Sequence, residues 1–266
     1  MNSIAWNKAP GNCVLITAMK IFILGCLFIL ISACQPATPT LVLAPTTTLP
    51  ASPTTIPVTN TPQPTPTQTP ELTSTPFPRF FTDEFDGSLD AWTLLQAGSD
   101  AIPTIKTENS NFILQLDAPF MWAYAISGAH EYENIRVDAS FTNQAGSPAS
   151  IGLLCRYSET EGWFEYNVST DGTYNVLYGQ WLADGIADYL PILSASSNAI
   201  QPSGTAQEIG LLCSGTVLSL FIDQNLIRNV EVSQYELTGG KIGITASSFE
   251  NTPVIAAFGW VRVSEP

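Results

Sequence analysis

The sequence has few basic residues and a single histidine, and both shortages exclude classes of function. Lys and Arg number nine against 23 Asp and Glu, which gives a formal net charge of −14 at pH 7. Nucleic-acid binding depends on Lys and Arg that neutralise phosphates, so we expect no nucleic-acid partner. His130 is the only histidine, and no Gly-x-Ser-x-Gly segment is present. A serine-histidine-aspartate triad or a zinc site is therefore not expected.

The N-terminal apolar run is too short to cross a bilayer. It extends from Ile21 to Ile31, whereas a membrane-spanning helix needs roughly 20 residues. A lysine precedes the run, and the order Ile31-Ser32-Ala33-Cys34 follows it. This order resembles the bacterial lipobox, whose cysteine is acylated and becomes the first residue of the mature protein. We expect residues 1–33 to be a lipoprotein signal peptide, with either Met1 or Met19 as its start.

Lipidation at Cys34 would place the rest of the chain outside the cytoplasm, anchored to a bacterial cell membrane. An ordinary secretory peptide and a retained anchor helix are the alternatives, and both also predict an extracytoplasmic protein. From Gln35 to Pro78 the chain consists almost entirely of Pro, Thr, Ser, Ala and single aliphatic residues. This composition cannot form a core, so we expect residues 34–78 to be a lipidated cysteine followed by a disordered linker.

Residues 79–266 are expected to form one all-β domain, with seven Lys and Arg against 22 Asp and Glu. Apolar residues alternate with polar ones between frequent Gly, Asn, Asp and Ser breaks, and no stretch has sustained helical periodicity. The strands predicted from this pattern are 79–85, 102–108, 111–117, 122–127, 134–142, 149–158, 162–169, 173–181, 205–213, 216–224, 226–232, 240–246 and 254–263.

The clearest local signal is Asp171-Gly172 between two alternating runs, which predicts a hairpin with a two-residue turn. In that register Tyr166 lies opposite Leu177 and Glu165 lies opposite Tyr178. One face would then belong to the core, with Phe164, Tyr166, Val168 and Leu177. The other face would mix aromatic rings with hydrogen-bonding groups, and it carries Trp163, Glu165, Asn167, Tyr174, Tyr178 and Gln180.

Cys155 and Cys213 are the thiols that remain if the signal peptide is removed and Cys34 is acylated. They occupy similar contexts, IGLLCRY and IGLLCSG, and an oxidising compartment would favour a disulfide between them. The alternative is two buried, unbridged thiols, since cysteine is often an apolar core residue.

Several segments together resemble one superfamily. They are Phe81-Thr82-Asp83-Glu84-Phe85, GLLCRY at 152–157, the Trp-Phe-x-Tyr-x-Val strand at 163–168, the Asp-Gly hairpin, the run at 210–223 that ends in Leu-Phe-Ile-Asp, and a final aromatic-x-x-Val-x-Val strand. This order resembles the concanavalin A-like jelly rolls, in particular laminin G-like and 3-keto-disaccharide hydrolase-like domains. The resemblance implies two curved antiparallel sheets, adjacent first and last strands, and ligands on the concave face or rim loops.

The chain departs from these relatives at a calcium site. Relatives often end in a Phe-Asp-Asn-Val-like strand whose acid lies near a structural calcium, but this chain has Phe258-Gly259-Trp260-Val261. Asp83, Glu84 and Asp86 remain weak calcium candidates by residue type, and exposed acids at a strand start are the alternative. No other cofactor is indicated.

The sequence offers no recognisable catalytic residues. A laminarinase-type glycosidase needs carboxylates in Glu-x-Asp-x-x-Glu order on one strand, and that order is absent. Aromatic platforms and hydrogen-bonding groups instead favour a non-catalytic module that binds carbohydrate or another extracellular polymer. The candidate ligand residues are Trp163, Glu165, Asn167, Tyr174, Tyr178, Gln180 and Arg156, with Trp122, Tyr124, Trp181 and Tyr189 on neighbouring segments.

Three alternatives stay open. The same aromatic residues would suit a plain sheet face. The domain would otherwise be a glycoside-acting enzyme of the keto-disaccharide hydrolase type, or a structural or protein-interaction module of the cell envelope. The sequence does not indicate an oligomeric state.

Overall fold

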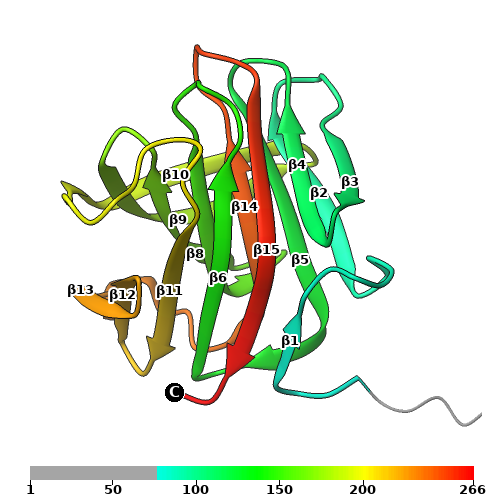
Figure 1. Cartoon of the computed structure of the whole chain (residues 1–266). Helices are drawn as coiled ribbons and strands as arrows, with labels where there is room; N and C mark the ends of the chain where they lie inside the picture. The colour runs from blue at the N-terminus through cyan, green and yellow to red at the C-terminus, as the bar shows by residue number, and fades with distance from the viewer. Residues whose placement is uncertain (1–76) are drawn as a thin grey trace, which may run out of the picture. The chain divides into compact units, whose positions relative to one another are not determined.

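The computed structural model describes residues 77–266, which fold into two antiparallel β-sheets packed face to face (Figure 1). This confirms the predicted all-β jelly-roll sandwich. The predicted signal peptide, the Cys34 lipidation site and the linker up to residue 76 lie outside the described residues. Within residues 77–266, no helix has the length and apolarity needed to span a membrane.

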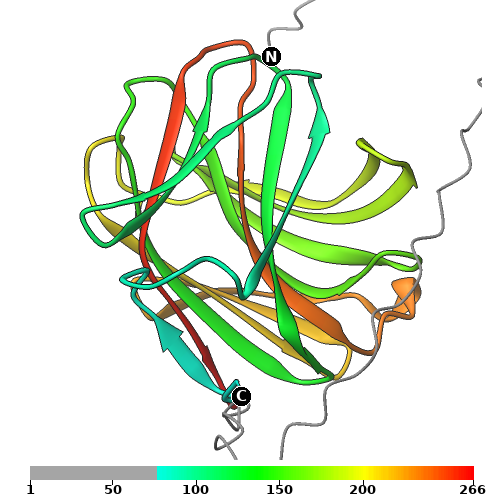
Figure 2. The ribbon, with the colours of Figure 1, turned by 90° about the vertical axis from the view of Figure 1, so that its right-hand side faces the viewer.

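Sheet A has eight strands in the order β13-β12-β11-β6-β15-β4-β3, with β1 paired to β15. Its strands are β1 (Phe81–Asp83), β3 (Thr104–Glu108), β4 (Asn111–Leu116), β6 (Ile135–Asn143), β11 (Gln207–Ser214), β12 (Val217–Ile222), β13 (Asn225–Glu231) and β15 (Val254–Ser264). Figure 2 shows β1 beside the end of β15. The expected adjacency of the first and last strands is therefore confirmed.

Sheet B has seven strands in the order β10-β9-β8-β7-β14-β5-β2. Its strands are β2 (Trp92–Gly98), β5 (Met121–Tyr132), β7 (Ser150–Ser158), β8 (Gly162–Ser169), β9 (Thr173–Ala183), β10 (Ile186–Ser196) and β14 (Gly240–Ser247). A short 3-10 helix, Ser233–Tyr235, precedes β14.

The core lies between the sheets, because each strand turns alternate residues inward. Phe112 and Leu114 of β4 and Phe164 and Tyr166 of β8 are among its fully buried side chains. A disulfide joins Cys155 of β7 to Cys213 of β11, so it links sheet B to sheet A through the core. The predicted bridge is confirmed.

Two strands were missed by the sequence prediction, β2 and β10. The β2 segment, WTLLQAG, lacks strict alternation. The β10 segment contains Pro191, which cannot donate a hydrogen bond and so argues against a strand. Pro191 is tolerated because β10 is an edge strand of sheet B and its pairing with β9 shifts between Pro191 and Leu193.

The predicted register of the β8–β9 hairpin is wrong by one residue. Glu165 lies opposite Leu177 and Phe164 lies opposite Tyr178. The loop has three residues, 170–172, rather than two, with Gly172 at a φ of 93° donating its N–H to Ser169 O at 2.9 Å. A three-residue loop with glycine in the left-handed region is a common hairpin connection. Because of the extra loop residue, every side chain of β9 lies on the face opposite to the one predicted.

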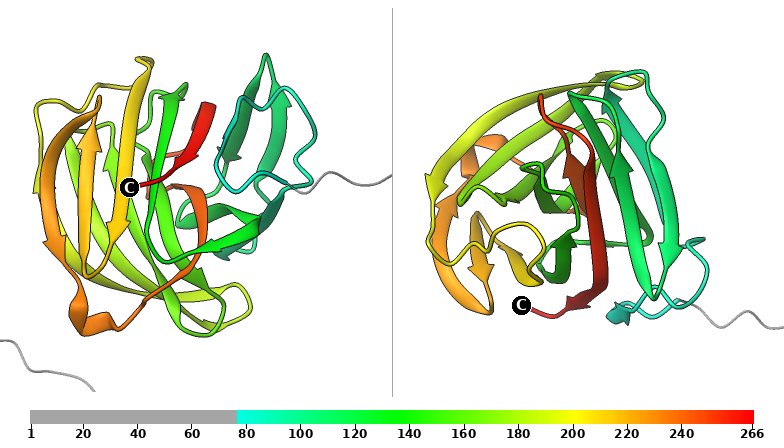
Figure 3. Two further views of the ribbon diagram at one scale, coloured as in Figure 1. Left: turned by 90° about the horizontal axis from the view of Figure 1, so that it is seen from below. Right: turned by 45° about the horizontal axis from the view of Figure 1, so that its top comes forward.

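Sheet B curls until its two edge strands meet. Gly98 N, at the end of β2, donates to Gly185 O in the β9–β10 turn at 3.2 Å. Figure 3 (right) shows β9 and β10 sweeping across toward β2. Residues on the inside of this curl, which we call the concave face, are therefore enclosed by their own sheet.

Candidate functional site

The concave face is filled by aromatic side chains. Trp163 is its centre, with ring centroids 5.2 Å from Trp181, 5.6 Å from Tyr157 and 5.8 Å from Tyr124. Trp122 of β5 stacks on Tyr189 of β10 at 5.5 Å, across the curl of the sheet. We call these six residues the aromatic cluster. Tyr124, Tyr157 and Trp163 belong to a second small hydrophobic cluster, separate from the core between the sheets, and the other three pack against it.

Glu165 lies beneath the aromatic cluster with 0% of its surface exposed. Its Oε2 accepts from Trp163 Nε1 at 3.1 Å, and its Oε1 accepts from Asn167 Nδ2 at 2.8 Å. Burial raises the pKa of the Glu165 carboxyl, and these two hydrogen bonds offset part of that rise. Both oxygens are thus engaged within the protein, and no substrate reaches them in this conformation.

Two phenols lie close to this carboxyl. The hydroxyls of Tyr124 and Tyr189 are hydrogen-bonded to each other. Burial raises the pKa of Tyr124 well above its usual range, and the negative charge of Glu165 adds to the effect. Burial likewise raises the pKa of Tyr189. The raised pKa values mean that the interior of the concave face favours the neutral forms of these phenols.

At one margin of the aromatic cluster the concave face opens into a hollow of about 620 Å³, which we call the rim hollow. Trp181 and Tyr157 form its aromatic wall, and Trp181 Nε1 donates to the Tyr157 hydroxyl at 3.0 Å. Its polar lining residues are Gln96 of β2, Glu159 after β7 and Asp184 in the β9–β10 turn, and the Gln96 amide already donates to Ala101 O at 3.4 Å. Leu94, Leu95, Ala183 and Gly185 complete the lining.

The rim hollow was only partly anticipated from the sequence. Trp181 was named among the neighbouring aromatics, but Tyr157, Gln96, Glu159 and Asp184 were not. Gln96 and Asp184 belong to the part of the sheet where β2 and β10 were missed. A prediction that lacks these two strands cannot place the β9–β10 turn beside β2.

The predicted ligand residues of β8 and β9 separate in the structure. Trp163, Glu165 and Asn167 lie on the concave face as predicted, but all three are buried. Tyr174 and Tyr178 were placed on that face and instead point to the other side: Tyr174 belongs to the main core, and Tyr178 stacks on Tyr235 at 4.8 Å.

The same one-residue shift moves two further residues of β9. Gln180 follows the alternation of Tyr178 and turns away from the concave face, and Leu177, predicted to be core, lies opposite Glu165 on the concave side. The predicted placement of Gln180 and Leu177 is therefore wrong.

Arg156, another candidate ligand residue, holds three backbone segments together. It sits at an irregularity of β7 with φ of 54° and is 2% exposed. Its guanidinium donates to Leu237 O at 2.6 Å, to Gly215 O at 2.6 Å and to Glu133 O at 3.2 Å. Burial lowers the pKa of this guanidinium. These contacts assign it a packing role at the ends of the strands.

The weak calcium candidates lie at the start of the domain. Asp83, Glu84 and Asp86 line a hollow of about 500 Å³. The Asp83 carboxylate already accepts from Phe85 N at 2.8 Å and from Trp92 Nε1 at 2.8 Å. Among residues 77–266, no group of three His, Cys, Asp or Glu side chains is arranged to hold a metal ion.

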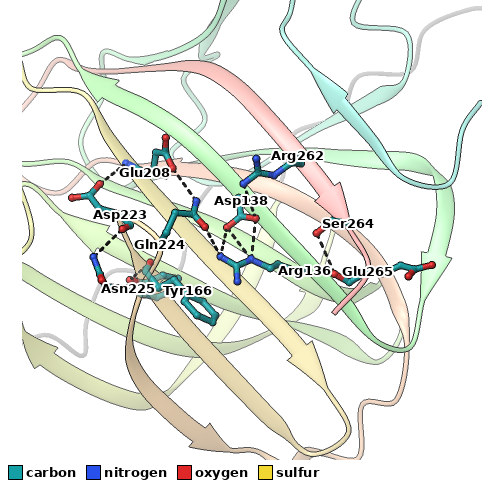
Figure 4. A network of polar contacts seen from close by, with 11 residues as sticks. Arg136, Asp138, Tyr166, Glu208, Asp223, Gln224, Asn225, Arg262, Ser264 and Glu265 are labelled. Atoms are coloured by element: carbon teal, nitrogen blue, oxygen red, sulfur yellow. Dashed lines mark hydrogen bonds and ion pairs between the residues drawn. The ribbon is translucent and has the colours of Figure 1, made fainter.

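The outer face of sheet A carries a different polar arrangement (Figure 4). Asp138 is 1% exposed, and Arg136 donates to both of its carboxylate oxygens at 2.9 to 3.1 Å. Arg262 reaches the same carboxylate at 3.4 Å, and Gln224 accepts from Arg136 at 2.8 Å. Arg262 also lies 5.1 Å from the centre of the Trp260 ring. This face therefore has aromatic and charged groups that are already engaged with one another.

No protein-family model matches the chain, and no curated protein matches it either. Solved structures do. A structure described as a native glycosidic hydrolase has a TM-score of 0.51 at 12% identity, covering 73% of this chain and 100% of that chain. A Bacillus subtilis protein of unknown function with a galectin-like fold has a TM-score of 0.50 at 12% identity, covering 70% and 94%. At such identities the likeness concerns the fold alone, and it supports the predicted concanavalin A-like jelly roll.

Proposed function

We propose that this chain is an extracytoplasmic, lipid-anchored protein whose β-sandwich binds carbohydrate, or a closely related extracellular polymer, without catalysis. The observation that carries the proposal is the rim hollow. Its volume of about 620 Å³ falls in the range of roughly 300 to 1,000 Å³ that small-ligand sites occupy.

The groups of the rim hollow match the two surfaces of a sugar. Trp181 supplies an aromatic wall for the apolar C–H face of a pyranose ring, and the buried Tyr157 holds Trp181 in place. Glu159 and Asp184 supply carboxylate groups that can accept hydrogen bonds from its hydroxyls. Since the Trp181 and Tyr157 side chains are held by their mutual hydrogen bond, the wall is formed before a ligand arrives, and little entropy is lost on binding.

A glycoside-acting enzyme is the second candidate. Hydrolysis with retention requires two carboxyl groups about 5 to 5.5 Å apart, and the buried Glu165 has both oxygens engaged. Catalysis would then depend on Glu159 and Asp184 at the rim hollow. Hydrolysis of keto-sugar glycosides or β-glucans that disappears in both Glu159→Gln and Asp184→Asn would establish the enzyme instead.

A glycan array tests the binding proposal with the full-length protein in detergent. Trp181→Ala should abolish the signal, whereas Trp260→Ala, a half-buried tryptophan on the outer face of sheet A, should leave it unchanged. A blank array, or binding indifferent to Trp181→Ala in a variant that unfolds like the parent protein, would contradict the proposal. If the array is blank and a pull-down from cells recovers a protein partner, an envelope interaction module would be favoured.

Lipid anchoring has a separate test. Radiolabelled palmitate should enter the protein, and Cys34→Ser should lose the label and leave the membrane fraction. The Cys26→Ser variant is the matched control, because that cysteine lies within the expected signal peptide. Label that persists in Cys34→Ser would refute anchoring at this residue.

A further inference from the structure

Two more hollows lie beside the rim hollow. The second, of about 330 Å³, shares Tyr157 and Glu159 with the rim hollow. The third, of about 580 Å³, shares Glu131, Gly239 and Gly240 with the second. Because neighbouring hollows share lining residues, the three are consecutive, and we call them together the end groove. Such a groove suits a polymer of several units better than a single sugar.

The end groove is acidic along its whole length. Its carboxylates are Glu131, Glu133, Glu159, Glu161 and Asp184. Its basic residues are Arg79 and Lys241. Each of the three hollows contributes at least one exposed carboxylate, so the negative charge follows the groove rather than one end of it.

These carboxylates are not paired within the domain. The ion pairs formed among residues 77–266 involve Lys106 with Glu108, and Arg136 and Arg262 with Asp138. The guanidinium of Arg79 donates to the backbone oxygen of Glu131 at 3.2 Å and lies 4.9 Å from the centre of the Tyr132 ring. The groove therefore presents unneutralised negative charge beside an aromatic wall.

We propose that the end groove binds a polysaccharide that carries protonated amino groups, as a de-N-acetylated aminosugar polymer does. This inference rests on the proposed carbohydrate-binding function and narrows it to a cationic glycan. A ring of such a polymer would stack on Trp181, and its ammonium groups would lie against Glu159, Glu161 and Glu131. Polymers with uronate or phosphate groups are repelled by the same carboxylates, since like charges facing each other across an interface raise its free energy.

Calorimetry with the full-length protein in detergent distinguishes the glycan classes. The probes are glucosamine oligosaccharides and N-acetylglucosamine oligosaccharides of equal length, which share a backbone and differ in charge. The glucosamine series should bind more tightly, and its affinity should fall as salt is raised, because salt screens exposed charges. Glu159→Gln combined with Glu161→Gln should weaken that binding by about fivefold, the scale of two exposed ion pairs.

The matched control is Glu250→Gln combined with Glu265→Gln, which changes the net charge equally with exposed acids outside the groove. It should leave binding unchanged. Equal affinity for both oligosaccharides would overturn the inference and leave the proposed function standing. The same conclusion would follow if neither oligosaccharide series binds while the array detects another glycan. A lysine peptide of the same charge that binds as tightly as glucosamine chains would also overturn it, because the groove would then select charge and not sugar.

Discussion

Trp163 donates its indole N–H to the carboxylate of Glu165, 3.1 Å away and two residues along β8, and both side chains are fully buried. This pair lies on the concave face, where the sequence resemblance predicts that a ligand binds. Here the face is occupied by the protein's own aromatic cluster. The hollow that remains open lies at the rim of this face, and Trp181 and Tyr157 are among the residues that line it.

The first prediction concerns the pH dependence of stability at Glu165. Burial raises the pKa of this carboxyl in the folded state, so the folded protein binds the proton more tightly than the unfolded chain does. The contribution of Glu165 to stability is then fully present below its unfolded-state pKa of about 4.3, and it declines as the pH rises toward its folded-state pKa. Glu165→Gln should remove this decline, so the melting temperature of the variant relative to that of the parent protein should rise as the pH is raised above about 4.3.

Glu250→Gln is the control for this measurement, because Glu250 is exposed. Its melting temperature should follow that of the parent protein at every pH. An absolute loss of stability in Glu165→Gln would not by itself be informative, since the amide can accept only one of the two hydrogen bonds. A difference between Glu165→Gln and parent that stays constant across the pH range would contradict the raised pKa.

The second prediction concerns Gly179 of β9. A Cβ at this position would collide with the indole ring of Trp163, so the backbone of β9 passes directly over the centre of the aromatic cluster. Gly179→Ala should lower the free energy of unfolding by about 1 to 3 kcal/mol, as overpacked cores do, and should shift the tryptophan fluorescence. Gly146→Ala places a Cβ in open space and should change neither quantity.

The third prediction concerns the disulfide between Cys155 and Cys213. The bond closes a loop between residues separated by 58 positions, so its removal should cost about 4 kcal/mol in the chain-entropy account. Chemical denaturation of Cys155→Ala combined with Cys213→Ala should show that loss. Peptide mapping without reductant should recover the two cysteine peptides joined, and their recovery as separate peptides would refute the bridge.

The fourth prediction concerns Arg156. Its guanidinium donates to three backbone carbonyls from three different segments, one buried and two partly buried, and Arg156→Ala would remove all three bonds and leave a void in the packing. The expected cost is about 3 kcal/mol, measured by denaturant unfolding. Arg228→Ala, at an exposed position of edge strand β13, should cost less than about 0.5 kcal/mol. Similar losses in the two variants would argue against the packing role of Arg156.

The fifth prediction tests whether a ligand contacts Tyr178, as the sequence suggested, or Trp181 at the rim hollow. Tyr178 was expected to contact a ligand, but it packs on Tyr235 and donates its hydroxyl to Glu161 O at 2.7 Å. Tyr178→Phe should therefore retain any glycan affinity that the parent protein shows, while Trp181→Ala should lose it. Equal losses would return the site to the face that the sequence suggested.

Local patterns were sufficient to predict the class of fold, because alternation and turn residues depend on a few neighbouring positions. The hairpin at Asp171-Gly172 was found on that basis, as were the buried inner positions of β8. Its register was not, since two-residue and three-residue loops contain the same Asp-Gly pair and differ only in where pairing resumes. That single position decided on which face Tyr174, Tyr178 and Leu177 lie.

The rim hollow could not be derived from the sequence for a different reason. It depends on the contact between Gly98 and Gly185, residues far apart in the chain that meet only because sheet B curls. Neither glycine has a pattern that signals this meeting. The sequence also suggested an accessible aromatic face, whereas curling buries Trp163 and Glu165 and leaves only the margin open.

The closure between β2 and β10 also bears on how neighbouring copies behave at high density. An unpaired strand edge is where another chain adds by backbone hydrogen bonding, and curling turns both outer strands of sheet B toward each other. In residues 77–266 sheet A ends in β3 and β13, and sheet B ends in β2 and β10, which meet only at the bond from Gly98 to the β9–β10 turn. The strands β3 and β13 are short, β3 carries the Lys106–Glu108 pair, and β10 contains Pro191. Short strands, charged residues and proline at sheet edges oppose strand-to-strand aggregation, so we expect crowded molecules to resist it.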